Sequence, residues 1–259
     1  VINTDGQTYR YLINNANFES YVKVIKKNAE TGKTIPYAGA GFKIYDPDGK
    51  LVTMTYTYPT PTTIDTFYTD ANGSLITPER LTYGKGYKLV EVQAPYGYVI
   101  DRTPVSFDIT ADTATEDGGI ILVVIEVENK PILGSVKVTK VDEDNPEIKL
   151  SGAVFEIHVD VDRNKEFNPD IDCLVGEVAE DEFGVYIMKE LRYNGYFIHE
   201  KSAPDGYIKD DGYHYFEITE DGAVIGLEIT NEKIPEPETP NPDIPNTDAS
   251  WRLGFWIGM

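Results

Sequence analysis

The sequence has few of the groups on which most catalytic and nucleic-acid sites depend. Its 259 residues include one cysteine, Cys173, so no disulfide can form within the chain. Lysine and arginine number 23 against 44 acidic residues, a formal net charge of −21, and no basic patch is visible, so nucleic acid is not an expected partner. The three histidines (His158, His199 and His214) are scattered, and neither G-x-S-x-G nor H-E-x-x-H occurs. We therefore expect no turnover enzyme and no cofactor.

A repeated segment dominates what is present. YKLVEVQAPYGY at residues 87–98 returns as YFIHEKSAPDGY at residues 196–207. Side chains alternate along a strand, so Glu91 and Glu200 each share a face with apolar neighbours two and four residues earlier. An unpartnered carboxylate on a buried face costs several kcal/mol. Each glutamate is therefore predicted to have buried polar partners.

The partners are predicted from the first and last strands of each repeat. Lys26 ends the strand motif V-x-V-x-K, and Lys140 ends its second copy. Asn129 and Asn231 end apolar strands on the same face as the preceding valine or isoleucine. Any one of these residues alone would be interpreted as a polar residue where a strand leaves the core. Three polar residues in the same order in both repeats favour a functional cluster.

This pattern resembles the Cna B-type, or SpaA-like prealbumin-fold, domains of Gram-positive surface proteins and pilins. The resemblance covers both repeats, about residues 20 to 234. It implies two intramolecular isopeptide bonds, Lys26–Asn129 and Lys140–Asn231, with Glu91 and Glu200 as the catalytic residues.

The same chemistry is physically reasonable for these residue types. Burial lowers the pKa of a lysine, and the neutral amine is a nucleophile. A buried carboxyl that stays protonated can polarise an amide carbonyl and transfer a proton to leaving ammonia. The fold supplies proximity. The reaction occurs once in each repeat, so it is self-processing and not turnover.

The fold class is predicted to be all-β, with two tandem Ig-like, or prealbumin-like, β-sandwich domains at residues 20–131 and 132–234. Short strands rich in Tyr, Val, Ile and Thr, separated by turn signals, favour this class. The short connection at residues 130–135 predicts domains that sit end to end with limited bending. Residues 54–69, MTYTYPTPTTIDTFYT, hold two prolines and are predicted to form a long edge loop.

An acidic insertion raises the question of a metal. Asp160, Asp162, Asn164 and Glu166 occupy alternate positions, as at the start of a calcium-binding loop. The glycine expected at the sixth position is Lys165, and the closing glutamate is replaced by Ile171. A solvated acidic loop is the favoured interpretation, with calcium as the alternative.

The two ends suggest further modules. Residues 1–19 are interpreted as the remnant of a truncated upstream domain, because Asn15 precedes Lys26 by the same interval that separates Asn129 from Lys140; a disordered leader is the alternative. Residues 235–259 are predicted to hold a proline-rich spacer, a sorting signal and the start of a truncated membrane span. The signal, similar to the sortase motif LPxTG, comprises Ile244, Pro245, Asn246, Thr247 and Asp248. Asp248 replaces the glycine, which puts processing in question.

The hypothesis for function is an extracellular, cell-wall-anchored stalk or pilus protein. Its expected partners are sortase and peptidoglycan or other pilus subunits. The alternative is an adhesin module that binds a host matrix protein or a glycan. Pilus backbone subunits usually carry a Y-P-K lysine, but Thr60 follows Tyr58-Pro59 here, which favours a stalk, basal or anchoring protein.

Overall fold

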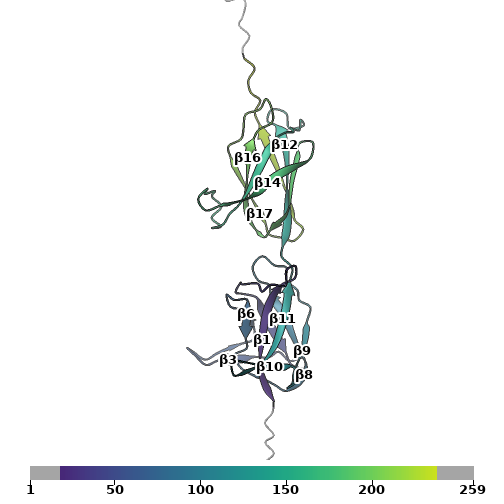
Figure 1. Cartoon of the computed structure of the whole chain (residues 1–259), viewed down its shortest axis with the longest axis vertical. Coiled ribbons are helices and arrows are strands. Elements are labelled where there is room, and N and C mark those ends of the chain that lie inside the picture. The colour runs from purple at the N-terminus through teal and green to yellow at the C-terminus, as the bar shows by residue number, and fades with distance from the viewer. Residues whose placement is uncertain (1–17, 238–259) are drawn as a thin grey trace, which may run out of the picture.

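The computed structural model describes residues 18–237, and this part of the chain consists of strands and connections without a helix. Figure 1 shows two β-units stacked end to end along the longest axis of the molecule. The first unit contains strands β1 to β11 and the second contains β12 to β18. Two separate hydrophobic cores, one within each unit, confirm the prediction of an all-β chain with two tandem sandwiches.

The first unit packs two sheets face to face. One sheet has the order β10-β11-β1-β6, with β7 also paired to β1, and the other has the order β5-β2-β8-β9. A separate pair, β3 and β4, completes the unit. The strands are β1 (Glu19–Asn28), β2 (Gly41–Tyr45), β3 (Met54–Tyr56), β4 (Thr62–Ile64), β5 (Phe67–Tyr68), β6 (Ser74–Ile76), β7 (Leu81–Thr82), β8 (Gly84–Gln93), β9 (Val105–Ile109), β10 (Ala114–Asp117) and β11 (Ile120–Asn129).

The first, middle and last strands of the second unit are arranged like those of the first unit. Its two layers, however, are joined by one strand. β14 pairs with β13 through its first half and with β15 through its second half, so one strand passes from one layer to the other. The resulting order is β17-β16-β13-β14-β15-β12-β18. The strands are β12 (Leu133–Asp142), β13 (Val154–Val159), β14 (Cys173–Glu182), β15 (Val185–Arg192), β16 (Asn194–Ser202), β17 (Tyr213–Ile218) and β18 (Val224–Asn231).

The first and last strands of each unit lie side by side and run in the same direction. β1 pairs in parallel with β11 from Tyr21–Leu122 to Asn28–Asn129. β12 pairs in the same way with β18, ending at Asp142–Asn231. Alternate residues of these strands face the core, which explains why their buried positions are two residues apart. This pairing therefore determines the face toward which Asn129 and Asn231, the last residues of β11 and β18, point.

The segment at residues 54–69 differs from its prediction as one long loop. Its first part forms the antiparallel strands β3 and β4, which pair from Met54–Ile64 to Tyr56–Thr62, and β5 near its end pairs with β2. Pro59 lies in the connection, after a cis peptide bond, and Pro61 lies beside it. Proline lacks the N–H that a ladder needs, so both prolines fall outside the pairing, while the β-branched threonines around them form strands.

The predictions about the two ends fall outside the described residues. These are the upstream remnant with Asn15, the sorting signal at residues 244–248 and the truncated membrane span. Between residues 18 and 237, the structure has no helix with the length and hydrophobicity needed to cross a bilayer.

Candidate functional site

Lys26, Glu91 and Asn129 come together inside the first unit, each from a different strand. Lys26 lies near the end of β1, Asn129 is the last residue of β11, and Glu91 lies near the end of β8 in the opposing sheet. The parallel register sets Lys26 opposite Val127, so Asn129, two residues further on, points to the same side. Strand alternation therefore directs all three polar side chains into the core.

The carboxylate of Glu91 lies between the other two groups. Its Oε1 is 3.0 Å from Lys26 Nζ. Its Oε2 accepts hydrogen bonds from Asn129 Nδ2 at 2.7 Å and from the Asp101 backbone N–H at 2.9 Å. Asn129 Nδ2 also donates to the Val99 carbonyl at 2.7 Å. Oε2 is thus occupied by two N–H donors, whereas Oε1 faces the amine.

The second unit repeats this arrangement group for group. Glu200 Oε1 is 3.6 Å from Lys140 Nζ. Glu200 Oε2 accepts hydrogen bonds from Asn231 Nδ2 at 2.8 Å and from the Asp210 backbone N–H at 2.8 Å. Asn231 Nδ2 also donates to the Ile208 carbonyl at 2.7 Å. The match extends to the backbone groups, so it is a property of the fold and not of one chance contact.

Both clusters are closed to water and short of hydrogen bonds. Lys26 and Lys140 are 0% exposed, and the glutamates and asparagines are at most 3% exposed. Desolvation by burial lowers the pKa of both lysines, although each has a glutamate beside it that acts in the opposite direction. In each unit the lysine Nζ, the glutamate Oε1 and the asparagine Oδ1 have no hydrogen-bond partner, because Nζ and Oε1 approach without hydrogen-bond geometry.

The A-P-x-G-Y motif now has a structural explanation. In both repeats the residue after the glycine donates its backbone N–H to the proline carbonyl at 3.2 Å, which closes a turn directly after the glutamate strand. Gly97 and Gly206 take φ angles of 78° and 83°, in the left-handed region that favours glycine. The turn brings the following segment back across the cluster, where it supplies Val99 O and Ile208 O to the asparagine amides.

The turn tyrosines make a further contact that sequence reasoning missed. Tyr98 Oη accepts a hydrogen bond from Asn28 Nδ2 at 3.1 Å. Tyr207 Oη donates to Asp142 Oδ2 at 2.9 Å. Asn28 and Asp142 each lie two residues after the cluster lysine, so the same alternation that identified the lysines was a signal for them. These contacts pin the turn to the end of the first strand.

The acidic loop between β13 and β14 places its residues differently from the prediction. Asp160 and Asp162 come together, but their third partner is Asp172, which sequence reasoning missed. Glu166 lies outside this group, and Asn164 donates its side-chain amide to Asp162 at 3.0 Å. The sequence signal for Asp172 was its position just before β14. This strand lies beside β13, which ends directly before Asp160.

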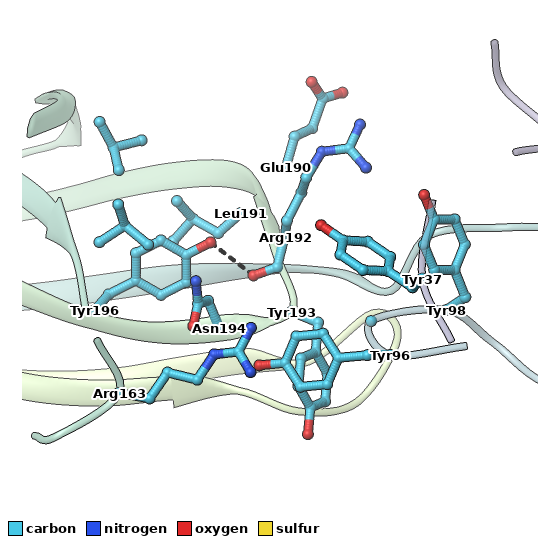
Figure 2. A pocket seen from close by; sticks show the side chains of 13 residues that line it. Tyr37, Tyr96, Tyr98, Arg163, Glu190, Leu191, Arg192, Tyr193, Asn194 and Tyr196 are labelled. Carbon is cyan, nitrogen blue, oxygen red and sulfur yellow. Dashed lines mark hydrogen bonds between the residues drawn. The ribbon is translucent and has the colours of Figure 1, made fainter. Parts of the chain in front are cut away.

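A pocket with a volume of about 480 Å³ lies between the two units. Figure 2 shows its tyrosines converging from both units, with Arg163 beside the ring of Tyr96. The Tyr96 and Tyr193 rings meet edge to face with centroids 4.7 Å apart, and the Arg163 guanidinium lies 4.0 Å from the Tyr96 centroid. On its wall, Tyr196 donates to the Arg192 carbonyl at 2.7 Å, and burial raises the Tyr196 pKa to about 12. The pocket lies at the interface between the units, and none of the lysine, glutamate and asparagine residues of the two clusters lines it.

Known structures resemble this chain to different degrees. The TIE protein of Bacillus anthracis is 29% identical with a TM-score of 0.64; the match covers 84% of this chain and 35% of that one. A streptococcal ancillary pilin is 24% identical with a TM-score of 0.33, covering 85% and 63%. A C-terminal fragment of the pilus adhesin SpaC from Lactobacillus rhamnosus GG is 14% identical with a TM-score of 0.47, covering 86% and 100%. No curated protein matches the chain.

The family assignment comes from the sequence of both units. The SpaA family, described as a prealbumin-like fold domain, matches residues 20–119 and again residues 134–233, so the matches together cover more than half of the chain. Each match contains its unit's lysine and glutamate, and the second also contains Asn231. The chain therefore belongs to the SpaA family of prealbumin-like fold domains, of which it carries two.

Proposed function

We propose that each unit closes an intramolecular amide, Lys26 to Asn129 and Lys140 to Asn231. In each reaction the lysine Nζ forms a bond to the asparagine Cγ, the bond from Cγ to Nδ2 breaks, and ammonia leaves. The observation that carries the proposal is that both clusters leave the same three reacting groups without hydrogen-bond partners. A buried amine without a hydrogen-bond partner is costly, and condensation converts it into the N–H of a neutral amide.

The positions of the glutamate oxygens favour a proton relay. Transfer of one proton from the Lys26 ammonium to Glu91 across 3.0 Å leaves both groups neutral and the amine nucleophilic. After that transfer Glu91 is a neutral carboxyl. As the amine attacks Asn129 Cγ, the carboxyl gives its proton to the leaving Nδ2, which lies 2.7 Å from Oε2, and takes one proton from the attacking Nζ. Ammonia leaves, the new amide keeps one N–H, and Glu91 is again a neutral carboxyl, so the atoms balance.

The closed surroundings favour a reaction without turnover. A substrate needs a path to the reacting atoms, but the three side chains of each cluster are between 0% and 3% exposed. Any reaction in this place therefore joins groups of the same chain. The proximity that the strands supply is the main catalytic contribution we assign to the fold.

The larger function that we propose is a rigid structural segment of an extracellular, cell-wall-anchored or pilus-associated protein. Each amide would close a loop of roughly 90 to 104 residues, for which the chain-entropy model of cross-links gives roughly 4 to 5 kcal/mol. Such a cross-link needs no oxidising compartment, which suits a chain with a single cysteine. The end-to-end arrangement of the two units in Figure 1 supports the proposal of an elongated structural segment. Sortase acting at Thr247 is the anchoring step that we propose.

Intact mass spectrometry of the purified chain tests the amides. We expect the mass of the sequence less two molecules of ammonia, and fragmentation should recover branched peptides that join Lys26 to Asn129 and Lys140 to Asn231. The double variant Asn129→Ala with Asn231→Ala is the control and should show its full sequence mass. A wild-type chain with its full sequence mass would contradict the proposal.

A further inference from the structure

Three carboxylates gather in the loop that joins β13 to β14, which begins at the end of β13 away from Phe155, the residue that pairs with Glu200. One carboxylate oxygen from each of Asp160, Asp162 and Asp172 lies within 4.8 Å of the other two. Asp160 directly follows β13, and Asp172 directly precedes β14, so the paired strands hold both ends of the group in place. Asp160 and Asp172 are buried, whereas Asp162 is exposed.

The second observation concerns the burial of Asp160. Its side chain is 0% exposed, and its Oδ1 has no hydrogen-bond partner, whereas Oδ2 accepts only the Lys165 backbone N–H at 3.2 Å. A buried carboxylate oxygen without a donor is costly, and two further carboxylates beside it increase that cost. A positive charge among the three would remove the deficit.

The protein does not supply that charge itself. Among residues 18–237, no lysine, arginine or histidine nitrogen lies within ion-pair distance of the three aspartates. The two basic residues of the loop are engaged elsewhere: Arg163 lies over the Tyr96 ring, and Lys165 Nζ lies 2.7 Å from Glu217 Oε1. The backbone N–H groups of Val161 and Asn168, at 3.0 and 2.8 Å, orient the Asp172 carboxylate without neutralising it.

We propose that Asp160, Asp162 and Asp172 bind one calcium ion. An all-oxygen, carboxylate-rich group suits a hard cation. Calcium lies about 2.3–2.6 Å from its ligands, so opposite ligand oxygens are about 5 Å apart, which agrees with a group contained within 4.8 Å. Magnesium demands a near-ideal octahedral set and loses its water reluctantly, so a group of three protein carboxylates suits it less well. Water and loop carbonyls would complete the six to eight ligands that calcium takes.

Calorimetric titration of the full chain with calcium chloride, after removal of bound metal by chelation, tests the site. We expect one saturable site, in the range of about 10⁻⁴–10⁻³ M typical of extracellular calcium modules. Magnesium chloride should bind at least tenfold more weakly. Because the chain is strongly acidic, the titration is made in about 0.15 M salt, where exposed charges are screened beyond about 8 Å.

Two variants and a control locate the ion. Asp162→Asn changes an exposed ligand and should fold normally, and it should weaken calcium binding at least tenfold. Asp160→Asn should do the same. Asp48→Asn removes an exposed charge from the turn that follows β2 in the first unit and should leave binding unchanged. Amide NMR shifts on calcium addition should concentrate in residues 160–172.

Three outcomes would overturn the assignment. One is the absence of saturable calcium binding up to about ten times the upper end of that range. Another is equal binding in Asp162→Asn and wild type, which would place the ion elsewhere. The third is a magnesium affinity equal to that for calcium. If Asp160→Asn fails to fold, the wild-type titration and Asp162→Asn still decide the question.

Discussion

At the scale of single residues, the unusual feature is a lysine amine enclosed in each hydrophobic core. Lys26 and Lys140 are among the largest fully buried side chains in the described part of the chain. Enclosure of a free ammonium costs several kcal/mol even beside a carboxylate, so a folded protein rarely retains one without a use. Removal of the glutamate beside each amine tests whether the cluster reacts chemically or only packs in the core.

Glu200→Ala and Glu200→Gln are expected to fold but to leave Lys140 and Asn231 unjoined. Gln keeps the size and a hydrogen-bond donor but cannot relay protons, so it should abolish or greatly slow the reaction. The first unit, with Glu91 unchanged, is an internal control. Intact mass after long incubation should therefore show the loss of one ammonia and not two. Complete loss of two from Glu200→Ala would remove the glutamate from the mechanism.

The lowered pKa of Lys140 predicts a pH dependence once its bond is prevented. In Asn231→Ala the amine stays free, and burial holds its pKa below the ordinary value of 10.5. Between the lowered pKa and 10.5 the unfolded chain binds more protons than the folded chain, so the free energy of unfolding should rise with pH across this window. Denaturant titrations of the second unit's transition at several pH values measure the slope.

The control for this dependence is Asn231→Ala combined with Lys140→Met, which keeps a long apolar side chain in the same place. Its stability should lack the rise over the same window. Equal slopes for the two variants would mean that the dependence comes from other groups.

At the scale of strands, the parallel pairing of first and last strands brings the cluster together. Alternation along the strands, which can be read from the sequence, was sufficient to predict that Lys26, Glu91 and Asn129 face the core. Contacts made by turns were not predictable in this way. Tyr98 reaches Asn28 only because the preceding turn reverses the chain, and Asp172 reaches Asp160 only because β14 returns beside β13. Periodicity assigns faces, whereas turn geometry decides which residues meet.

The turn tyrosines give a paired prediction at this scale. Tyr98→Phe removes a hydrogen bond between neutral groups and should lower the free energy of unfolding by about 0.5–1.5 kcal/mol. Tyr207→Phe should cost more, because its acceptor is the charged Asp142 carboxylate. Denaturant titration measures both, with exposed Tyr58→Phe as the control.

The tyrosine prediction also has a pH signature. The hydrogen bond from Tyr207 is the largest cause of the lowered pKa of Asp142, whose ordinary value is 3.8. A depressed carboxyl pKa adds stability above 3.8 that is lost as the pH falls through the lowered value. The excess cost of Tyr207→Phe over Tyr98→Phe should therefore shrink in acid. An excess that is constant with pH would contradict this assignment.

At the scale of the whole molecule, backbone and side-chain contacts cross from one unit to the other. β11 ends at Asn129 and β12 begins at Leu133, and backbone hydrogen bonds of 2.9 Å from Val99 N to Lys130 O and from Ile132 N to Gly97 O hold the connection. Tyr96 adds side-chain contacts to the second unit. The two units are therefore connected by hydrogen bonds and aromatic contacts in addition to the covalent chain.

Tyr96→Ala is expected to loosen the junction without changing either core. It removes the edge-to-face contact with Tyr193 and the cation–π contact with Arg163, each worth about 0.5–1.5 kcal/mol. Small-angle scattering should show a wider range of shapes, and NMR relaxation should show the units tumbling more independently. Tyr58→Ala, at a side chain that is 86% exposed, is the control. Identical scattering from Tyr96→Ala and wild type would assign the stiffness to the backbone alone.

The position of each lysine relative to the parallel strands has a mechanical consequence. A pull on the two ends of the chain enters β1 at its start and leaves the first unit after Asn129. With the proposed amides, tension would pass from Lys26 directly to Asn129 and from Lys140 directly to Asn231. Residues 27–128 and 141–230 would then lie outside the line of force. Under tension, only the strand segments outside these two loops would carry the force, and they would not lengthen further until a covalent bond broke. Both sandwiches would remain folded without bearing load.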